Sequence, residues 1–327
     1  MNIRVATSQP RAQGLPSVSI RFGNPAPSSQ LALLSRGKGG SMKEILSENS
    51  SQNTHISGPV SVRENKTQTD FSIQKERYPA GMTSVTFREK SISEIADIAH
   101  AAGLSLIEWG ADRHILPGDR NAVKEALSCM ERYGLSCFSY GSYYRIGDGE
   151  PDTFRTICET AKALGAHVVR TWLGRKPSSQ LSEEERLFLL KQTKIMAGIA
   201  AAHGLILAFE FHGGTLNDNG KSAAEFLTEC EMDNVKTYWQ PLAFGDSEAN
   251  LRAVLPWLCS VHVFHWDTEN RRYPLSLAEA AWRGYAEIVR AANNLPCPLP
   301  FLLEFVPGDS DEQFLADAKV LEDILHG

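Results

Sequence analysis

Residues 301 to 306 read Phe-Leu-Leu-Glu-Phe-Val, a strand-length apolar run with one carboxylate, Glu304, near its end. A buried carboxylate left alone neutralises itself through a raised pKa, whereas one that meets a metal ion or a cation stays ionised. A second run at residues 205–211, Leu-Ile-Leu-Ala-Phe-Glu-Phe, carries Glu210 in the same place. For one such glutamate, a solvent-facing or arginine-paired side chain is an equally good interpretation. Two in equivalent positions indicate a shared site.

Both runs belong to a regular alternation of short apolar runs and longer amphipathic ones. Eight strands are expected, each followed by a helix, at residues 83–87, 105–109, 135–140, 167–172, 205–211, 235–240, 260–266 and 301–306. Glycines stand where four of the helices are expected to end, in the position that favours a left-handed residue: Gly103, Gly134, Gly165 and Gly204. Eight strand–helix pairs in about 245 residues predict an α/β fold, a single closed (β/α)₈ TIM barrel, rather than an open doubly wound sheet.

Residues 1–80 differ in kind from the expected barrel at residues 81–327. They carry ten Lys/Arg and five Asp/Glu, a net charge of +5, which leaves −11 on the barrel. The segment is rich in Ser, Gln, Asn, Pro and Gly without a sustained period, so we expect it to be disordered. Because residues 1–43 contain arginines and serines but no acidic residue, an organellar targeting segment is one alternative. An over-long start-site assignment is the other.

Composition argues against several classes of function. No apolar run approaches the roughly 18 to 20 residues that span a bilayer, so no membrane association is expected. The six cysteines show no Cys-x-x-Cys spacing, which argues against a zinc knuckle or a disulfide framework and fits a reducing, cytoplasmic location. The negative charge of the barrel argues against a nucleic-acid partner. Assembly as a homo-oligomer is an open alternative.

The carboxyl ends of barrel strands form the mouth where active groups gather, and Glu210 and Glu304 lie there. Because residues two apart share a face of a strand, His212 is expected beside Glu210. In the seventh run, Val-His-Val-Phe-His-Trp-Asp from residue 261, we place His265 at the mouth and expect His262 to face a helix. The predicted ligand set has the mixed oxygen and nitrogen donors that suit Mn²⁺, Mg²⁺, Co²⁺ or Zn²⁺: Glu210, Gln240, His265 and Glu304.

The other side of the mouth carries aromatic and polar residues typical of a site for a sugar or polyol. The C–H faces of such a molecule pack on rings, while its hydroxyls need directed donors and acceptors. The candidates for substrate binding there are Glu108, Trp109, Arg170 and Trp172, with His212 across the mouth. Packing in the core is the alternative for each aromatic residue. For Gln240, hydrogen bonding to substrate without a metal is the alternative.

Four motifs occur in order along the chain: Ile-Glu-Trp-Gly, Phe-Glu-Phe-His, His-Trp-Asp-Thr-Glu-Asn-Arg-Arg and Leu-Leu-Glu-Phe. Together they resemble the xylose isomerase-like TIM-barrel superfamily, and within it the sugar phosphate isomerase and epimerase branch with tagatose 3-epimerase-like and hydroxypyruvate isomerase-like enzymes. The resemblance implies a divalent metal held from strands five to eight and a substrate contact from Arg271. Gln240 departs from the family's aspartate, and Ala243 stands where related epimerases have histidine, so metal dependence is an open point.

The resemblance implies a sugar, sugar-phosphate or polyol isomerase or epimerase. A polarised carbonyl would stabilise an enediolate while Glu210 and Glu304 take and return a proton alpha to it. Return to the opposite face gives epimerisation, and return to the neighbouring carbon gives aldose–ketose isomerisation. Two alternatives stay open: a dehydratase or lyase of the same superfamily, and a non-catalytic sugar-binding barrel in which Gln240 has weakened metal binding.

Overall fold

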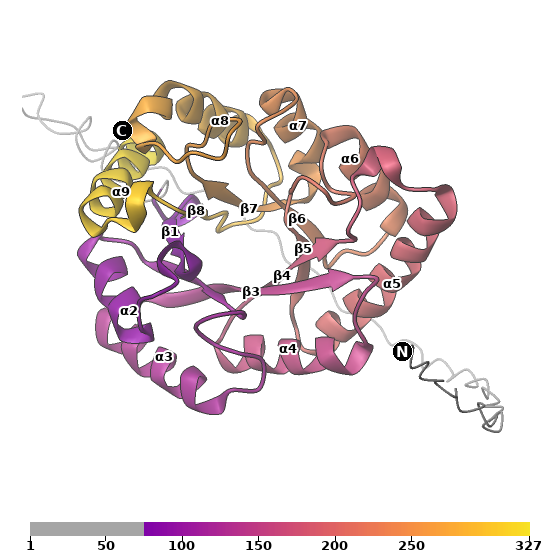
Figure 1. Cartoon of the computed structure of the whole chain (residues 1–327), viewed down its shortest axis with the longest axis horizontal. Coiled ribbons are helices and arrows are strands. Elements are labelled where there is room, and N and C mark those ends of the chain that lie inside the picture. The colour runs from indigo at the N-terminus through magenta and orange to yellow at the C-terminus, as the bar shows by residue number, and fades with distance from the viewer. Residues whose placement is uncertain (1–74) are drawn as a thin grey trace, which may run out of the picture. The chain divides into compact units, whose positions relative to one another are not determined.

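The computed structural model describes residues 75–327, which form the predicted closed (β/α)₈ barrel. Eight parallel strands follow one another around the ring in sequence order, and β8 closes the ring against β1. Figure 1 shows the helices arranged around these strands. The expectations of disorder and targeting for residues 1–74 lie outside the described residues.

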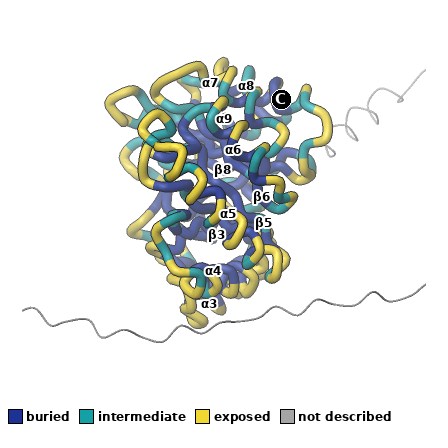
Figure 2. The backbone as a smooth tube through the Cα atoms, turned by 90° about the vertical axis from the view of Figure 1, so that its right-hand side faces the viewer, coloured by how far each residue is buried: buried dark blue, intermediate teal, exposed yellow. Residues whose placement is uncertain are grey.

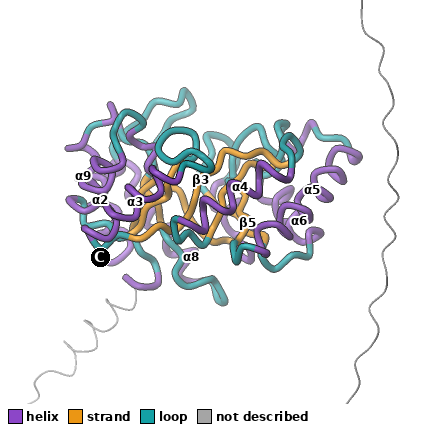
Figure 3. Tube along the Cα trace, turned by 90° about the horizontal axis from the view of Figure 1, so that it is seen from below, coloured by secondary structure: helices purple, strands orange, loops and turns teal. Residues whose placement is uncertain are grey.

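The strands are β1 (Ala80–Thr83), β2 (Leu106–Gly110), β3 (Ser136–Ile146), β4 (Val168–Leu173), β5 (Ile206–Phe209), β6 (Val235–Trp239), β7 (Leu258–Val263) and β8 (Phe301–Leu303). The α-helices are α2 (Ile92–Ala101), α3 (Arg120–Tyr133), α4 (Pro151–Ala163), α5 (Glu183–Ala202), α6 (Gly220–Cys230), α7 (Ser247–Val254), α8 (Glu279–Ala291) and α9 (Asp311–His326). Figure 3 shows the strands enclosed by these helices. Within residues 75–327 no helix is long and apolar enough to cross a membrane.

Local signals in the sequence set the helix boundaries. Ser182 caps α5 through a capping box, in which its side chain accepts from the amide of Glu185 while the Glu185 carboxylate accepts from the amide of Ser182. At the other end of a helix, Gly134 closes α3 with φ of 65°, a conformation that a residue with a Cβ adopts at a cost. The other three glycines expected at helix ends also have positive φ.

The barrel interior has an apolar base and a polar layer above it. Residues of the inner faces form a cluster of their own, separate from the larger core between strands and helices: Phe138, Val168, Ala208, Tyr238, Cys259 and Leu302. Most strand residues are buried, and most exposed residues lie on the outer helices and loops (Figure 2). Because side chains alternate along a strand, the inner faces carry polar residues two positions beyond four members of this cluster: Arg170, Glu210, Gln240 and Glu304.

Several strands differ from their predicted bounds: β3 continues to Ile146 instead of residue 140, and β8 ends at Leu303 instead of residue 306. The strand expected at residues 83–87 begins earlier, at Ala80, and most of the predicted range is a 3₁₀ helix, Ser84–Phe87. That helix is buried, so its apolar residues reflect packing rather than strand structure. The strand expected at residues 260–266 ends at Val263. The barrel also extends slightly beyond the expected boundary at residue 81, because Tyr78 and Ala80 are buried in the core.

Candidate active site

Polar residues at the carboxyl ends of β5 to β8 converge inside the barrel mouth. Glu210 directly follows β5, Gln240 follows β6, and Glu304 follows β8. Among the described residues, one group of three histidine or carboxylate side chains places its ligand atoms within 4.8 Å of one another: Glu210, His262 and Glu304. The structure therefore brings the two glutamates together and adds a histidine from β7.

The expectation that His262 faces a helix is wrong. His262 is fully buried, and its Nδ1 lies 3.1 Å from Oε1 of Gln240 and 3.4 Å from Oε2 of Glu304. The same nitrogen is 3.9 Å from Oε1 of Glu210. The register of the sheet explains this orientation, because His262 pairs with Leu302, whose side chain belongs to the inner cluster. Residues paired across neighbouring strands point to the same face.

His265, the ligand expected from the sequence, lies beyond the end of β7 and outside this group. Its Nδ1 is 3.3 Å from the carbonyl oxygen of Pro274, and its ring packs on Tyr273 with centroids 5.4 Å apart. Because the strand ends at Val263, the alternation assumed through residue 266 does not reach His265. His262 therefore replaces it in the candidate ligand set.

Arg170 joins the other half of the barrel to this group. Its side chain is 2% exposed, Nε donates to Oε1 of Glu108 at 2.8 Å, and Nη1 donates to Oε2 of Glu210. Ser139 donates from Oγ to the second oxygen of Glu108 at 2.8 Å. Gly141 gives Arg170 its space, because a Cβ at that position would stand 2.5 Å from Nη2 of the arginine. The guanidinium is thus enclosed between two buried carboxylates.

This pairing keeps both carboxylates ionised. Burial alone would raise the pKa of Glu108 and of Glu210, but the Arg170 guanidinium, with further help from His262, holds each pKa below its ordinary value. Glu108 and Arg170, both proposed from the sequence as substrate-binding residues, lie behind the mouth and pair with each other, and Arg170 also pairs with Glu210. Their position indicates that they hold Glu210 in place and keep it ionised.

Trp172 completes the orientation of Glu210. Its indole Nε1 donates to the same Oε2 that Arg170 contacts, which leaves Oε1 of Glu210 on the side of His262. The Trp172 ring also stacks on His212, with centroids 5.1 Å apart and an interplanar angle of 30°. Trp172 and His212 therefore lie side by side, in contrast to the sequence-based expectation that placed them on opposite sides of the mouth.

The arrangement around His262 fits a divalent cation. While Nδ1 faces Gln240, Glu210 and Glu304, the opposite nitrogen Nε2 has no hydrogen-bond partner among residues 75–327 and lies 3.7 Å from Oε1 of Glu108. Histidines that bind a metal through one nitrogen usually present the other to a carboxylate or carbonyl. Two carboxylates, an imidazole and an amide oxygen are also a donor set that suits several divalent metals.

The charges agree with that fit. Three buried carboxylates face one buried guanidinium, so two negative charges stay unbalanced when the imidazole is neutral. Burial alone would lower the pKa of His262, but Glu304 and Glu108 raise it to about 10. The cluster therefore favours additional positive charge beside Nδ1, which either a proton or a divalent ion supplies.

Two residues expected to bind substrate lie away from the mouth. Trp109 is fully buried on the outer face of β2, where its Nε1 donates to Sδ of Met130 in α3 at 3.4 Å. Its assignment to the mouth is wrong, because its neighbour Glu108 faces inward. Arg271 has a side chain that is 62% exposed and pairs with Asp267 at 2.7 Å and with Glu269 at 3.2 Å, within its own loop.

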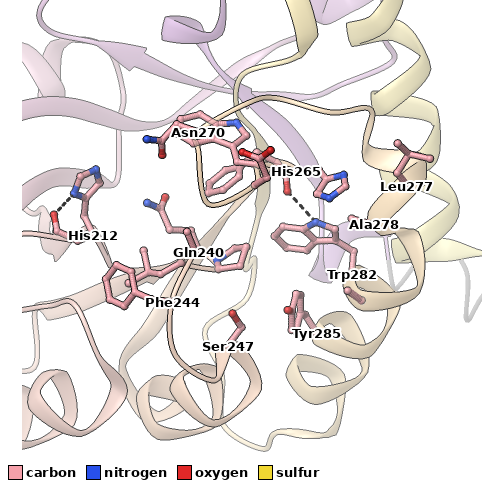
Figure 4. Close-up of a pocket in the computed structure, with 18 residues that line it drawn as sticks. His212, Gln240, Phe244, Ser247, His265, Asn270, Leu277, Ala278, Trp282 and Tyr285 are labelled. Carbon is pink, nitrogen blue, oxygen red and sulfur yellow. Dashed lines mark hydrogen bonds between the residues drawn. The ribbon is translucent and has the colours of Figure 1, made fainter.

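A pocket of about 490 Å³ opens beside the converging residues. Figure 4 shows His212 and Gln240 on one side of it and Trp282 and Tyr285 on another. The sequence places three of its lining residues at the mouth, His212, Gln240 and His265, but does not identify the loops after β6 and β7 that form most of its wall. His265 lines it, so that histidine belongs to the pocket wall.

Comparison with known proteins places the chain among enzymes. A family model described as xylose isomerase-like TIM barrel matches residues 96–323. A 3-dehydroshikimate dehydratase from Bacillus anthracis is 25% identical over 195 residues, which cover 55% of this chain and 69% of that protein.

Solved structures show the same fold. D-allulose 3-epimerase from Methylomonas sp. matches with a TM-score of 0.58 and 15% identity over 76% of this chain and 97% of the epimerase. The IolI protein, solved with a bound zinc atom, matches with a TM-score of 0.61 and 14% identity over 76% of this chain and 98% of its own. At these identities the likeness concerns the fold.

Proposed function

Because the chain belongs to the xylose isomerase-like TIM-barrel family, we propose that it is a sugar or polyol isomerase or epimerase that moves a proton alpha to a carbonyl. The observation that carries this proposal is the convergence of Glu210, His262 and Glu304 within 4.8 Å. Two carboxylates around one imidazole combine a cation site with two groups able to transfer protons. The mouth of a TIM barrel is also where its catalytic groups lie.

Glu210, His262 and Glu304 would hold a divalent metal, with Oε1 of Gln240 as a fourth ligand. Such an ion would polarise the carbonyl oxygen of the substrate and thereby acidify the neighbouring C–H bond. The zinc atom in the IolI structure supports a divalent ion in this fold. Because Gln240 is neutral, the ligand set carries one negative charge fewer than a set with three carboxylates, and a weaker metal affinity is expected.

The chain's own groups provide the proton transfer. Arg170 and Trp172 hold one oxygen of Glu210 and leave the other on the side of His262. Glu304 has a single ion-pair partner in the described part of the chain, His262. One carboxylate removes the proton and the other returns it: return to the opposite face inverts the carbon, and return to the adjacent carbon converts ketose to aldose.

A dehydratase is the second candidate, favoured by the 25% identical relative. The same carboxylate would remove the alpha proton, the bond from carbon to a β-hydroxyl oxygen would break, and the hydroxyl would leave as water after receiving a proton. The first step is common to all three reactions. The products therefore distinguish them.

The test is exchange of ¹H for ²H at the carbon alpha to the carbonyl, followed by NMR for a panel of ketoses in D₂O. We expect exchange that rises with added Mn²⁺ and stops when the metal is chelated. An epimer, an aldose or a dehydrated product then identifies the reaction. Sugar binding without any exchange, at saturating Mn²⁺, would contradict the proposal and identify a non-catalytic sugar-binding barrel.

A further inference from the structure

The pocket beside Gln240 extends away from the group that would hold the metal. Its walls come from the loop after β6, the loop after β7 and the start of α8. Gln240 and His212 line it, whereas Glu210 and Glu304 do not (Figure 4). Because Gln240 also contacts His262 at 3.1 Å, the pocket adjoins the reaction site. A substrate reacting at that site can therefore extend into it.

Aromatic rings form much of the pocket surface: Phe244, Phe264, Trp266, Trp282 and Tyr285. Trp282 is buried and fixed, because its Nε1 donates to the carbonyl oxygen of Phe264 at 3.1 Å and its ring meets Tyr285 edge-on with centroids 5.4 Å apart. Trp282 thus supports Tyr285 from behind. The accessible rings of Phe244, Trp266 and Tyr285 offer apolar faces to the C–H face of a sugar or to another aromatic ring.

Among the described residues, the lining of the pocket offers an anionic ligand no lysine or arginine. Its basic residues are His212 and His265, and it also contains the carboxylate of Asp267. The nearby Arg271 is paired with Asp267 and Glu269. A phosphate in this pocket would lose its hydration without gaining a charged partner, which is unfavourable. The occupant is therefore uncharged.

The rim and the size point to a substantial occupant. Phe244 is 57% and Leu277 70% exposed, although both are large apolar side chains at the edge of the pocket. A volume of about 490 Å³ lies within the roughly 300 to 1,000 Å³ typical of small-molecule sites.

We propose that this pocket binds an uncharged ring attached to the reacting sugar. The preferred substrate is then a sugar that carries an uncharged ring, and this pocket takes that ring rather than a phosphate. This inference rests on the proposed function for the position of the reacting end at Glu210 and Glu304. A second sugar ring and an aromatic group share the required chemistry, an uncharged face that packs on the rings of the pocket.

Four ketoses that differ only at one position test the proposal by calorimetry in the presence of Mn²⁺: D-fructose, its 6-O-glucosyl derivative isomaltulose, 6-O-benzyl-D-fructose and D-fructose 6-phosphate. We expect at least one ring-bearing compound to bind about tenfold or more tightly than fructose, and the phosphate no more tightly than fructose. The ring that gives the larger gain in affinity shows whether the natural substituent is a second sugar or an aromatic group. The proposal is overturned if the phosphate binds as tightly as the ring-bearing compounds, or if neither ring improves on fructose.

A matched pair of variants shows where on the protein the ring of the ligand binds. Ala281 lines the pocket from α8, while Ala280, its neighbour, is equally exposed and does not line it. Ala281→Trp should fill the pocket and remove the advantage of the ring, with unchanged affinity for fructose and Mn²⁺, whereas Ala280→Trp should keep that advantage. Phe244→Ala removes an aromatic side chain from the pocket without narrowing it, and should lower the affinity for the ring-bearing compounds several-fold. Retention of the full advantage in both Ala281→Trp and Phe244→Ala would show that the ring binds elsewhere.

These readouts separate this inference from the proposed function. Ring-dependent binding without ¹H/²H exchange would reject the catalytic role and leave the pocket assignment standing. If plain ketoses exchange the proton alpha to the carbonyl but neither ring improves affinity, the catalytic role stands and the pocket assignment is rejected.

Discussion

The two halves of the barrel mouth carry different chemistry. The strands β5 to β8 present groups that bind cations or transfer protons: Glu210, Gln240, His262 and Glu304. The strands β2 to β4 present groups that hold the first set in place: Glu108, Ser139, Arg170 and Trp172. The difference shows that a charged residue near an active site need not touch the substrate. Arg170 directs both of its ion pairs to protein carboxylates.

The largest expected effect concerns the half that transfers protons. Glu304→Gln and Glu210→Gln should each lower ¹H/²H exchange by about 10² to 10⁴, the usual contribution of a positioned acid–base group. Glutamine keeps the shape of the side chain but cannot accept a proton from carbon. Glu269→Gln, in the exposed loop after β7, is the control and should exchange like the parent. A Glu304→Gln or Glu210→Gln variant that retains exchange within about tenfold would not have the assigned role.

A large effect on stability is expected in the supporting half. Arg170→Met leaves Glu108 and Glu210 buried without their cation, and breaking a buried ion pair in this way costs about 3 to 5 kcal/mol. The free energy of unfolding, measured in denaturant, should fall by that amount. The exposed Arg271→Met should change it by less than about 0.5 kcal/mol, as surface substitutions usually do. Equal losses in the two variants would show that Arg170 does not stabilise the carboxylates.

The smallest expected effect concerns Gln240, the neutral member of the proposed set of metal ligands. Gln240→Asp adds a third anionic ligand, so calorimetric titration should show tighter Mn²⁺ binding. The gain should not exceed about tenfold, or about 1.4 kcal/mol, because the new carboxylate also repels Glu210 and Glu304 when no metal is bound. Exchange should stay unchanged or fall. Equal Mn²⁺ affinities in the two proteins would place Gln240 outside the coordination shell.

The fold could be predicted from the sequence because its signals are local. Alternating apolar runs, helix caps and glycines such as Gly134 mark each unit without reference to distant residues. The errors in the predicted strand bounds arose at segments that contain buried or aromatic residues but are not strands. Ser84–Phe87 contains the apolar residues Val85 and Phe87 because it is a buried 3₁₀ helix. The chain leaves β7 at Val263, while aromatic residues continue beyond it.

The site could be predicted in part, for a physical reason. Each glutamate is a lone charge in an apolar run, and that cost is visible in the sequence. His262 was also detectable, because Val261 and Val263 on either side belong to the core against the helices and leave it on the inner face. The contact between Arg170 and Glu108 was not detectable, because the two residues are 62 positions apart in the chain and meet across the intervening strand β3.

The central claim is that the inner face of β7, through His262, completes a divalent-metal site with Glu210 and Glu304. Calorimetric titration of Mn²⁺ into the parent, His262→Ala and His265→Ala tests it most directly, after circular dichroism has shown that each variant is folded. Loss of an outer partner of a metal ligand already costs 10- to 100-fold in affinity, so His262→Ala should weaken binding by about 100-fold or more, while His265→Ala stays within about twofold of the parent. A parent that binds no Mn²⁺, or a loss of affinity in His265→Ala but not in His262→Ala, would contradict the account.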